Sequence, residues 1–120
     1  MTERKGLAMQ YMVLIYLDEA ETDSVSYSKM SPEYEAYTAQ LAEAGVVRAS
    51  NRLQRSSTAT TVRIRDEEEL FTDGPFAEAR EQLGGFYMID VPDLDAALSW
   101  AARCPGASHG AIEVRPIWPM

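Results

Sequence analysis

Apolar side chains recur along this chain at two spacings, the two-residue spacing of strands and the wider spacing of helices. Residues 11–16 are apolar on both alternating faces, which is typical of a central strand that is covered on each side. Further strands are predicted at residues 85–91 and 110–117. Residues 46–53 and 58–65 are short alternating or β-branched runs joined by a polar segment, which predicts a β-hairpin.

Two helices are predicted from their capping residues and apolar stripes. Ser31 can cap the first helix, Pro32 suits its first turn, and Gly45 ends it. Asp93 can cap the second helix, which ends at residues 104–106. Residues 18–29 are polar and acidic and are expected to form a loop. The apolar stripes, which should face a sheet, are Met30, Tyr34, Tyr37, Leu41 and Ala44, and Leu94, Ala97, Leu98 and Ala101.

The predicted order is strand, helix, hairpin, strand, helix, strand. This order favours an α+β, ferredoxin-like antiparallel sheet with two helices on one face. In the last strand Ile112 and Val114 point to one side, while Glu113 and Arg115 point to the other. The sheet face away from the helices therefore carries ionisable groups among apolar ones. A second copy of the chain could cover it, so we expect a homodimer.

Length and charge narrow the functional classes. The 120 residues suit one domain, and we assign residues 1–9 to a flexible leader and residues 10–120 to the domain. The net charge of -8 disfavours binding to nucleic acid, because phosphate is also negative. No apolar run approaches the roughly 20 residues that cross a bilayer, so we expect a cytoplasmic protein without a membrane partner. Cys104 is the only cysteine, which excludes an internal disulfide and suggests a half-buried residue near a helix end.

The most distinctive segment is Thr72-Asp-Gly-Pro-Phe76. Asp73 can hydrogen-bond within its own turn, Gly74 permits positive φ, and Pro75 fixes the next residue. The segment therefore predicts a rigid turn. It also resembles the motif of the DGPF-type branch of the YCII-related family.

Three more segments are similar to that family: residues 11–16, the second helix at 93–105, and the closing strand at 110–117. The resemblance thus spans nearly the whole chain after residue 9. It implies a ferredoxin-like fold that dimerises sheet to sheet, as in dimeric α/β-barrel proteins. Some members resemble partners of, or are encoded beside, extracytoplasmic-function sigma factors, which implies an alternative role in sigma-factor association.

Enzymes of the wider YCII-related group are thought to use a His-Asp pair. The histidine lies at the start of the first helix and the aspartate in the turn that ends the second. Here Tyr34 stands near the first place and Cys104 near the second. Because both members of the pair are missing, the acid–base chemistry of those relatives does not carry over.

The only histidine, His109, precedes the last strand, on which Glu113 and Arg115 follow. His109 could act as acid or base, Glu113 could orient it or accept a proton, and Arg115 could hold an anion. The alternative is structural: Arg115 forms a salt bridge with Glu113 or Asp73 at a dimer seam, and His109 is solvated in a turn.

A second charged group comprises Asp73, Glu78, Arg80 and Glu81. If residues 75–83 form a helical turn, Glu78 and Glu81 share a face and could bind a ligand together. The alternative is a solvated face on a structural turn. The acidic residues 66–69 are expected to form a solvated loop and no metal site.

Tyr16 and Tyr87 lie on strands that should be neighbours, so both could line one pocket; ordinary core packing is the alternative for each.

These observations support a dimeric small-molecule-binding or regulatory module that needs no cofactor. The alternative is a cofactor-independent lyase or isomerase acting on a small acidic or aromatic substrate. In that alternative, Asp73 or His109 is the base and Arg115 anchors the anion. A sigma-factor-associated interaction protein is the second alternative.

Overall fold

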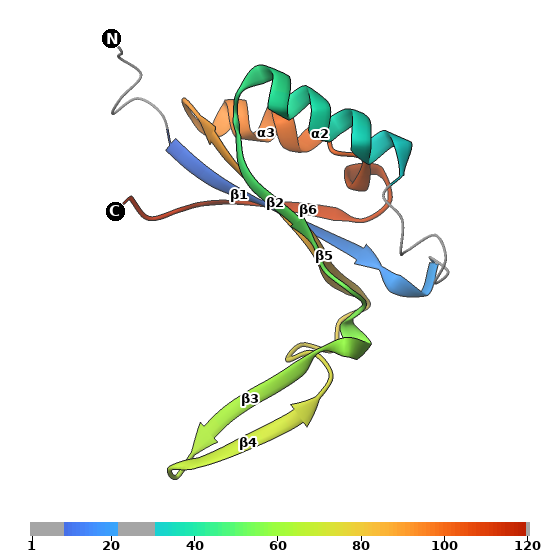
Figure 1. Cartoon of the computed structure of the whole chain (residues 1–120), viewed down its shortest axis with the longest axis vertical. Coiled ribbons are helices and arrows are strands. Elements are labelled where there is room, and N and C mark those ends of the chain that lie inside the picture. Colours follow the sequence, from blue (N-terminus) through green and yellow to red (C-terminus); the bar gives the residue numbers. More distant parts are fainter. Residues whose placement is uncertain (1–8, 22–30, 120) are drawn as a thin grey trace.

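The computed structural model describes residues 9–21 and 31–119. An antiparallel four-stranded sheet has the strand order β2-β5-β1-β6, and both helices cover one of its faces (Figure 1). The predicted ferredoxin-like α+β fold is confirmed. The elements of this layer are β1 (Met9–Asp18), α2 (Pro32–Ala44), β2 (Val47–Arg52), β5 (Glu81–Val91), α3 (Leu94–Ala102) and β6 (Ala111–Pro116).

Parts of the sequence-based expectations fall outside the described residues. The leader predicted at 1–9 lies outside them except for Met9, which begins β1. Most of the loop predicted at 18–29 also lies outside them, as does Met30. Within the described part, Asp18 ends β1 and residues Glu19–Glu21 form a short 3-10 turn, η1.

Both helices begin at the predicted capping residues. The Ser31 hydroxyl oxygen accepts a hydrogen bond from the Tyr34 backbone N–H at 3.2 Å. The Asp93 carboxylate accepts one from the Ala96 N–H at 2.9 Å. These bonds satisfy N–H groups that the first turn of a helix leaves without partners, which stabilises each helix by about 1 kcal/mol.

The core lies between the helices and one face of the sheet. Alternate residues of β1 and β5 point into it, because successive side chains of a strand face opposite ways. The sequence predicted that both faces of β1 are covered. Within a single chain, only the face toward the helices is covered. The buried side chains are Tyr11, Val13, Ile15, Tyr37, Leu41, Tyr87, Ile89, Val91, Ala97, Ala101 and Cys104.

The opposite side of the sheet, which we call the open face, carries an apolar stripe. Met12 pairs with Met88 and Leu14 pairs with Phe86 across the β1–β5 ladder, so the four side chains share this face. All four are half-buried. In the described part of the chain, no helix is long and apolar enough to cross a membrane.

The prediction that residues 46–53 and 58–65 form a hairpin is wrong. β2 pairs with β5 in the main sheet, while β3 (Thr60–Arg65) pairs with β4 (Glu68–Asp73) in a separate two-stranded sheet. The polar segment between the two predicted strands contains a 3-10 turn, η2 (Ser56–Thr58), rather than a hairpin loop. The prediction failed because strands can pair with partners far along the chain, and β2 pairs with β5, which begins at residue 81.

The β3–β4 hairpin closes through the acidic segment that was expected to be a loop. Asp66 and Glu67 form a two-residue turn with φ of 51° and 68°, and Arg65 pairs with Glu68. Two positive φ values give the tight turn whose twist matches that of paired strands. Glu68 and Glu69 belong to β4 instead. We call residues 60–73 the arm, because they project from the end of the sheet away from both helices (Figure 1).

The base of the arm is held by contacts with η1, directly after β1. The Glu19 carboxylate accepts hydrogen bonds from the Ser56 N–H at 2.8 Å and from the Ser56 hydroxyl at 2.7 Å. Arg55 donates to the Glu19 carbonyl at 2.9 Å. The β2–β5 ladder is extended by a bond of 2.9 Å from the Leu53 N–H to the Gly84 carbonyl. These bonds fix where the arm leaves the sheet.

Candidate functional site

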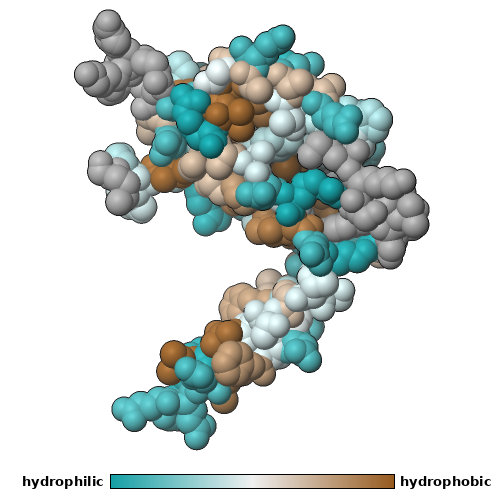
Figure 2. All heavy atoms as spheres, in the orientation of Figure 1, coloured by the Kyte–Doolittle hydropathy of each residue, from teal (hydrophilic) through white to brown (hydrophobic). Residues whose placement is uncertain are grey.

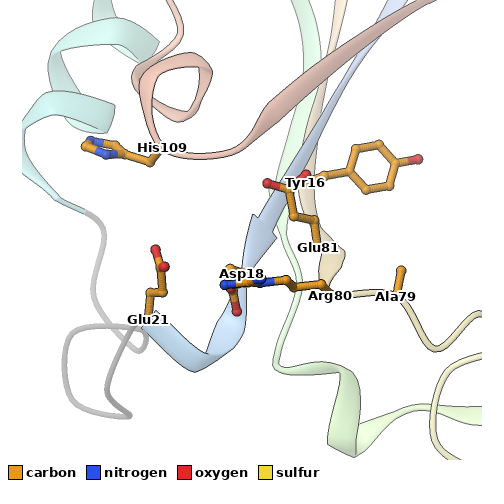
Figure 3. Close-up of a pocket in the computed structure, with 7 residues that line it drawn as sticks. All are labelled: Tyr16, Asp18, Glu21, Ala79, Arg80, Glu81 and His109. Atoms are coloured by element: carbon orange, nitrogen blue, oxygen red, sulfur yellow. The ribbon is translucent and has the colours of Figure 1, made fainter.

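A hollow of about 590 Å³ lies at the end of the sheet where β1 ends and β5 begins (Figure 3). It is open to solvent. The chain register accounts for its position, because Asp18 pairs with Glu81 and Tyr16 pairs with Ala111. The residues that line it are Tyr16, Asp18, Glu21, Ala79, Arg80, Glu81 and His109.

The approach of His109 to this hollow depends on Gly110. A Cβ at Gly110 would stand 2.1 Å from the Tyr16 carbonyl oxygen, so a larger residue could not follow this path. The Gly106 carbonyl accepts hydrogen bonds from the N–H groups of His109 at 3.2 Å and Gly110 at 2.8 Å. This tight turn, η3 (Pro105–Ser108) and its exit, places an exposed His109 beside the end of β1.

Asp18 and Arg80 form an ion pair on one wall of the hollow, with 2.9 Å between Nε and Oδ2. Figure 3 shows the two side chains lying side by side. The Arg80 hydrogen bond, followed by the Ala20 backbone N–H, lowers the pKa of the Asp18 carboxyl. The wall therefore presents a fixed negative charge beside a fixed positive one near neutral pH.

Tyr16 connects the hollow to the open face. Its hydroxyl donates to Glu113 at 3.1 Å, and Glu113 also accepts from Arg115, whose Nε lies 3.1 Å away. Arg115 first, then Tyr16, lowers the pKa of Glu113 by hydrogen bonding. Desolvation, followed by the Glu113 carboxylate, raises the pKa of Tyr16. Tyr16 is thus a neutral donor and Glu113 an ionised acceptor.

The predicted group of His109, Glu113 and Arg115 is divided between two places. His109 lines the hollow, whereas the other two lie further along β6 on the open face. The Arg115–Glu113 ion pair that the structural alternative predicted is confirmed. Its guanidinium is therefore already bound to a carboxylate, which makes it a weak candidate for an anion anchor.

The second predicted group is divided as well. Arg80 and Glu81 line the hollow, but Asp73 ends β4 on the arm, and Glu78 lies in the connection to β5. As predicted, Gly74 has a positive φ, 103°.

The condition under which Glu78 and Glu81 would share a helix face is not met, because residues 75–80 are irregular and β5 begins at Glu81. The Gln82 side chain donates to the carbonyls of Ala77 at 3.1 Å and Ala79 at 2.8 Å, which satisfies these groups without a helix. Glu78 and Glu81 therefore do not share a helix face.

Tyr16 and Tyr87 do not line one pocket. Tyr87 pairs with Val13, whose side chain points into the core, while Tyr16 faces the other side. The Tyr87 ring packs edge-on against Tyr37 with 5.3 Å between ring centroids. Its hydroxyl lies 2.7 Å from that of Thr38. Core packing is therefore the role of Tyr87.

The positions at which the resemblance places a His-Asp pair come together in the core. The Tyr34 hydroxyl lies 3.8 Å from the Cys104 sulfur. Burial raises the pKa of both groups, so both are neutral near physiological pH. Cys104 follows α3 and is fully buried, which is deeper than the half-buried position expected for it.

Sequence reasoning missed Asp18 and Glu21, which it placed in a polar loop. One signal in the sequence could have identified Asp18: it directly follows the apolar run of β1, so its carboxylate lies at the end of the strand. Across residues 9–21 and 31–119, no group of three His, Cys, Asp or Glu side chains could hold a metal ion.

Comparisons with known proteins agree with this fold. A family model described as the YCII-related domain matches residues 9–120. An uncharacterised protein of Rhizobium meliloti (strain 1021) is 40% identical to this chain over 114 residues. That similarity covers 91% of this chain and 92% of the relative.

Proposed function

Because the chain belongs to the YCII-related family, we propose that it is a small-molecule-binding module that works as a homodimer. The observation that carries this proposal is the hollow at the end of the sheet. Its volume of about 590 Å³ is that of a small-ligand site, and residues with ionisable side chains from three separate segments line it.

The charges around the hollow favour a particular class of ligand. Asp18, Glu21 and Glu81 are carboxylates, and Arg80 already bonds one of them. This acid-rich lining suits a small molecule that carries amino or hydroxyl groups, since these donate hydrogen bonds to carboxylates. A small carboxylic acid would meet repulsion here. Arg115, the cation that could anchor an acid, is paired with Glu113.

The open face supports the dimer. Met12, Leu14, Phe86 and Met88 form a half-buried apolar stripe that a second copy would cover. Tyr16 borders both this face and the hollow. A partner on the open face would therefore also enclose one side of the ligand site, which would strengthen its hydrogen bonds by excluding water.

Ligand-observed NMR with a mixture of primary amines, polyols and carboxylic acids tests the binding site. We expect amines or polyols to bind the wild type and to lose binding in the double variant Asp18→Asn with Arg80→Gln. A matched control, Arg103→Gln with Asp95→Asn, makes the same replacements at exposed positions on and directly after α3, and should leave binding unchanged. Equal binding to the wild type and the hollow variant would contradict the proposal, as would an absence of binding.

Sedimentation velocity tests the dimer. We expect Met88→Glu to dissociate it, because a charge would be buried in the apolar stripe. Leu98→Glu places the same charge on α3, where Leu98 is already exposed, and should leave the dimer intact. A dimer unaffected by Met88→Glu would show that the open face is not its interface.

A further inference from the structure

The arm exposes large apolar side chains far from the core. Val62, Ile64 and Phe71 are 55%, 62% and 64% exposed. Val62 pairs directly with Phe71, and Ile64 lies two residues along the same strand, so the three share one face of the arm. Figure 2 shows apolar residues gathered on this projection, with hydrophilic residues at its tip.

A hairpin of this kind is poorly stabilised without a partner. Two strands alone are marginal in water, and stability normally requires a third strand or a surface against which the apolar face packs. On the other face, Leu70 pairs with Arg63, whose guanidinium lies 4.8 Å from the centre of the Phe76 ring. The face with Val62, Ile64 and Phe71 carries the more exposed apolar side chains, since Leu70 on the other face is 43% exposed.

The charges of the arm indicate what covers it. Residues 66–73 contain five carboxylates and no Lys or Arg, whereas residues 47–55 contain three arginines and no carboxylate. The first stretch is the turn and β4, and the second is β2 with the start of its exit loop. β4 and β2 are both edge strands, each with one side unpaired within the sheets. The two edges are therefore opposite in charge, although Arg48 already pairs with Asp90 and Arg55 already donates to the Glu19 carbonyl.

A chain does not bring its own two edges together. The arm leaves the sheet beyond the end of β2 and carries its acidic tip away from that strand (Figure 1). A second copy carries the same net charge of -8, and its residues 47–55 offer the acidic arm a stretch without carboxylates. A second copy can therefore bring residues 47–55 to the acidic β4, which the arm's own chain does not do.

We propose that residues 60–73 are a docking arm for a second copy of this chain. Val62, Ile64 and Phe71 pack on the second copy, and the acidic β4 lies along its arginine-bearing stretch, residues 47–55. Twofold symmetry makes the contact twice, so each copy both gives and receives an arm. This inference rests on the dimer of the proposed function and adds a second interface to the open face.

Mixing two defective variants tests the contact directly. The arm variant is Glu68→Lys with Glu69→Lys, and the strand variant is Arg52→Glu. We expect each alone to dimerise at least about tenfold more weakly than the wild type, because both arm contacts are altered. In a mixed pair, the native arm of the strand variant meets the native stretch of the arm variant. The other contact sets the introduced lysines against the introduced glutamate, so both contacts are attractive and native mass spectrometry should show the mixed dimer in excess of either homodimer.

The apolar part has its own test. Ile64→Ser with Phe71→Ser should weaken the dimer by about tenfold or more in sedimentation equilibrium. Leu98→Ser removes a side chain that is 47% exposed on α3 and should have no effect. Circular dichroism of each variant shows whether the main sheet and helices remain folded.

The possible outcomes separate the arm from the dimer itself. A wild type that stays monomeric would overturn both. A dimer that is weakened by Met88→Glu and unchanged by the arm variants would keep the open-face interface and overturn the docking arm. In that case the apolar face of the arm would belong to a different protein. A mixed dimer no more abundant than chance would also overturn the proposed contact.

Discussion

The Tyr34 hydroxyl and the Cys104 sulfur lie 3.8 Å apart, although 70 residues separate them in the sequence. The pair joins α2 to the turn after α3, beneath Gly106, where a Cβ would stand 2.5 Å from the Tyr34 oxygen. Burial raises the pKa of both groups and keeps them neutral near physiological pH, and their contact packs α2 against the turn after α3.

The first prediction concerns the reactivity of Cys104. Its side chain is 2% exposed and burial raises its pKa, so little thiolate forms at pH 8 and reagents have no access. We expect the native thiol to react with a disulfide reagent on the order of 100-fold more slowly than the unfolded chain. An Ala102→Cys variant places a second thiol on an exposed part of α3 and should react rapidly. Rapid reaction of the wild type would indicate an accessible nucleophile.

The second prediction is a loss of stability in alkali. Burial raises the pKa of Tyr34, Tyr37 and Tyr87, so the unfolded chain releases these protons at lower pH than the folded protein. The free energy of unfolding is therefore retained below pH of about 10 and falls above it. Each such group contributes a slope of about 1.4 kcal/mol per pH unit.

Urea unfolding between pH 7 and pH 11.5 measures this slope. Tyr37→Phe removes one titrating group, together with its hydrogen bond to the Trp100 carbonyl, and should make the slope shallower by about 1.4 kcal/mol per pH unit. Ala39→Ser changes an exposed position on the same helix and should leave it unaltered. A slope unaffected by Tyr37→Phe would show that Tyr37 does not contribute to the loss of stability in alkali.

The third prediction concerns Asp18. Because the Arg80 hydrogen bond lowers the pKa of this carboxyl, carbon-detected NMR should show it titrating below the ordinary range of aspartate. The ion pair then stabilises the fold at neutral pH, and its contribution is lost as pH falls through the lowered pKa. Arg80→Gln should return the Asp18 pKa toward its ordinary value, whereas Arg65→Gln should not. An unchanged pKa in Arg80→Gln would show that another group holds the carboxylate.

The fourth prediction tests how the hollow is built. Gly110→Ala would place a Cβ 2.1 Å from the Tyr16 carbonyl oxygen, so the turn must move away from β1. We expect a loss of about 1–3 kcal/mol in the free energy of unfolding, together with shifted NMR signals for His109 and Tyr16. Ala107→Ser adds an atom at an exposed position in the same turn and should change neither. A neutral Gly110→Ala would show that the turn has room.

Local signals in the sequence predicted the parts of the fold that depend on neighbouring residues. Ser31 and Asp93 cap their helices because the bonds they accept come from residues three positions later. Strand pairing was not predictable in the same way. The stretch 46–53 looks like half of a hairpin, but its partner is β5, more than thirty residues further on.

In the candidate site, too, single residues could be predicted from the sequence, but their arrangement could not. Four of its residues, Tyr16, Arg80, Glu81 and His109, were among the candidates, but they were assigned to three different groups. Only the β1–β5 and β1–β6 registers bring them to one end of the sheet, and these registers are set by packing across the whole core. The sequence did not predict the tight turn at Asp66 and Glu67, because both residues have positive φ and neither is a glycine.

The β2–β5 ladder is complete before the arm begins, since Leu53 bonds Gly84 while residues 54–83 lie outside the pairs of that ladder. The arm is in this sense an insertion between two strands that already have each other as partners. Descendants of this sequence could lengthen, shorten or recharge it without altering the register of the main sheet. Divergence in the arm would then change which copies recognise one another, while the hollow at the end of β1 was inherited intact.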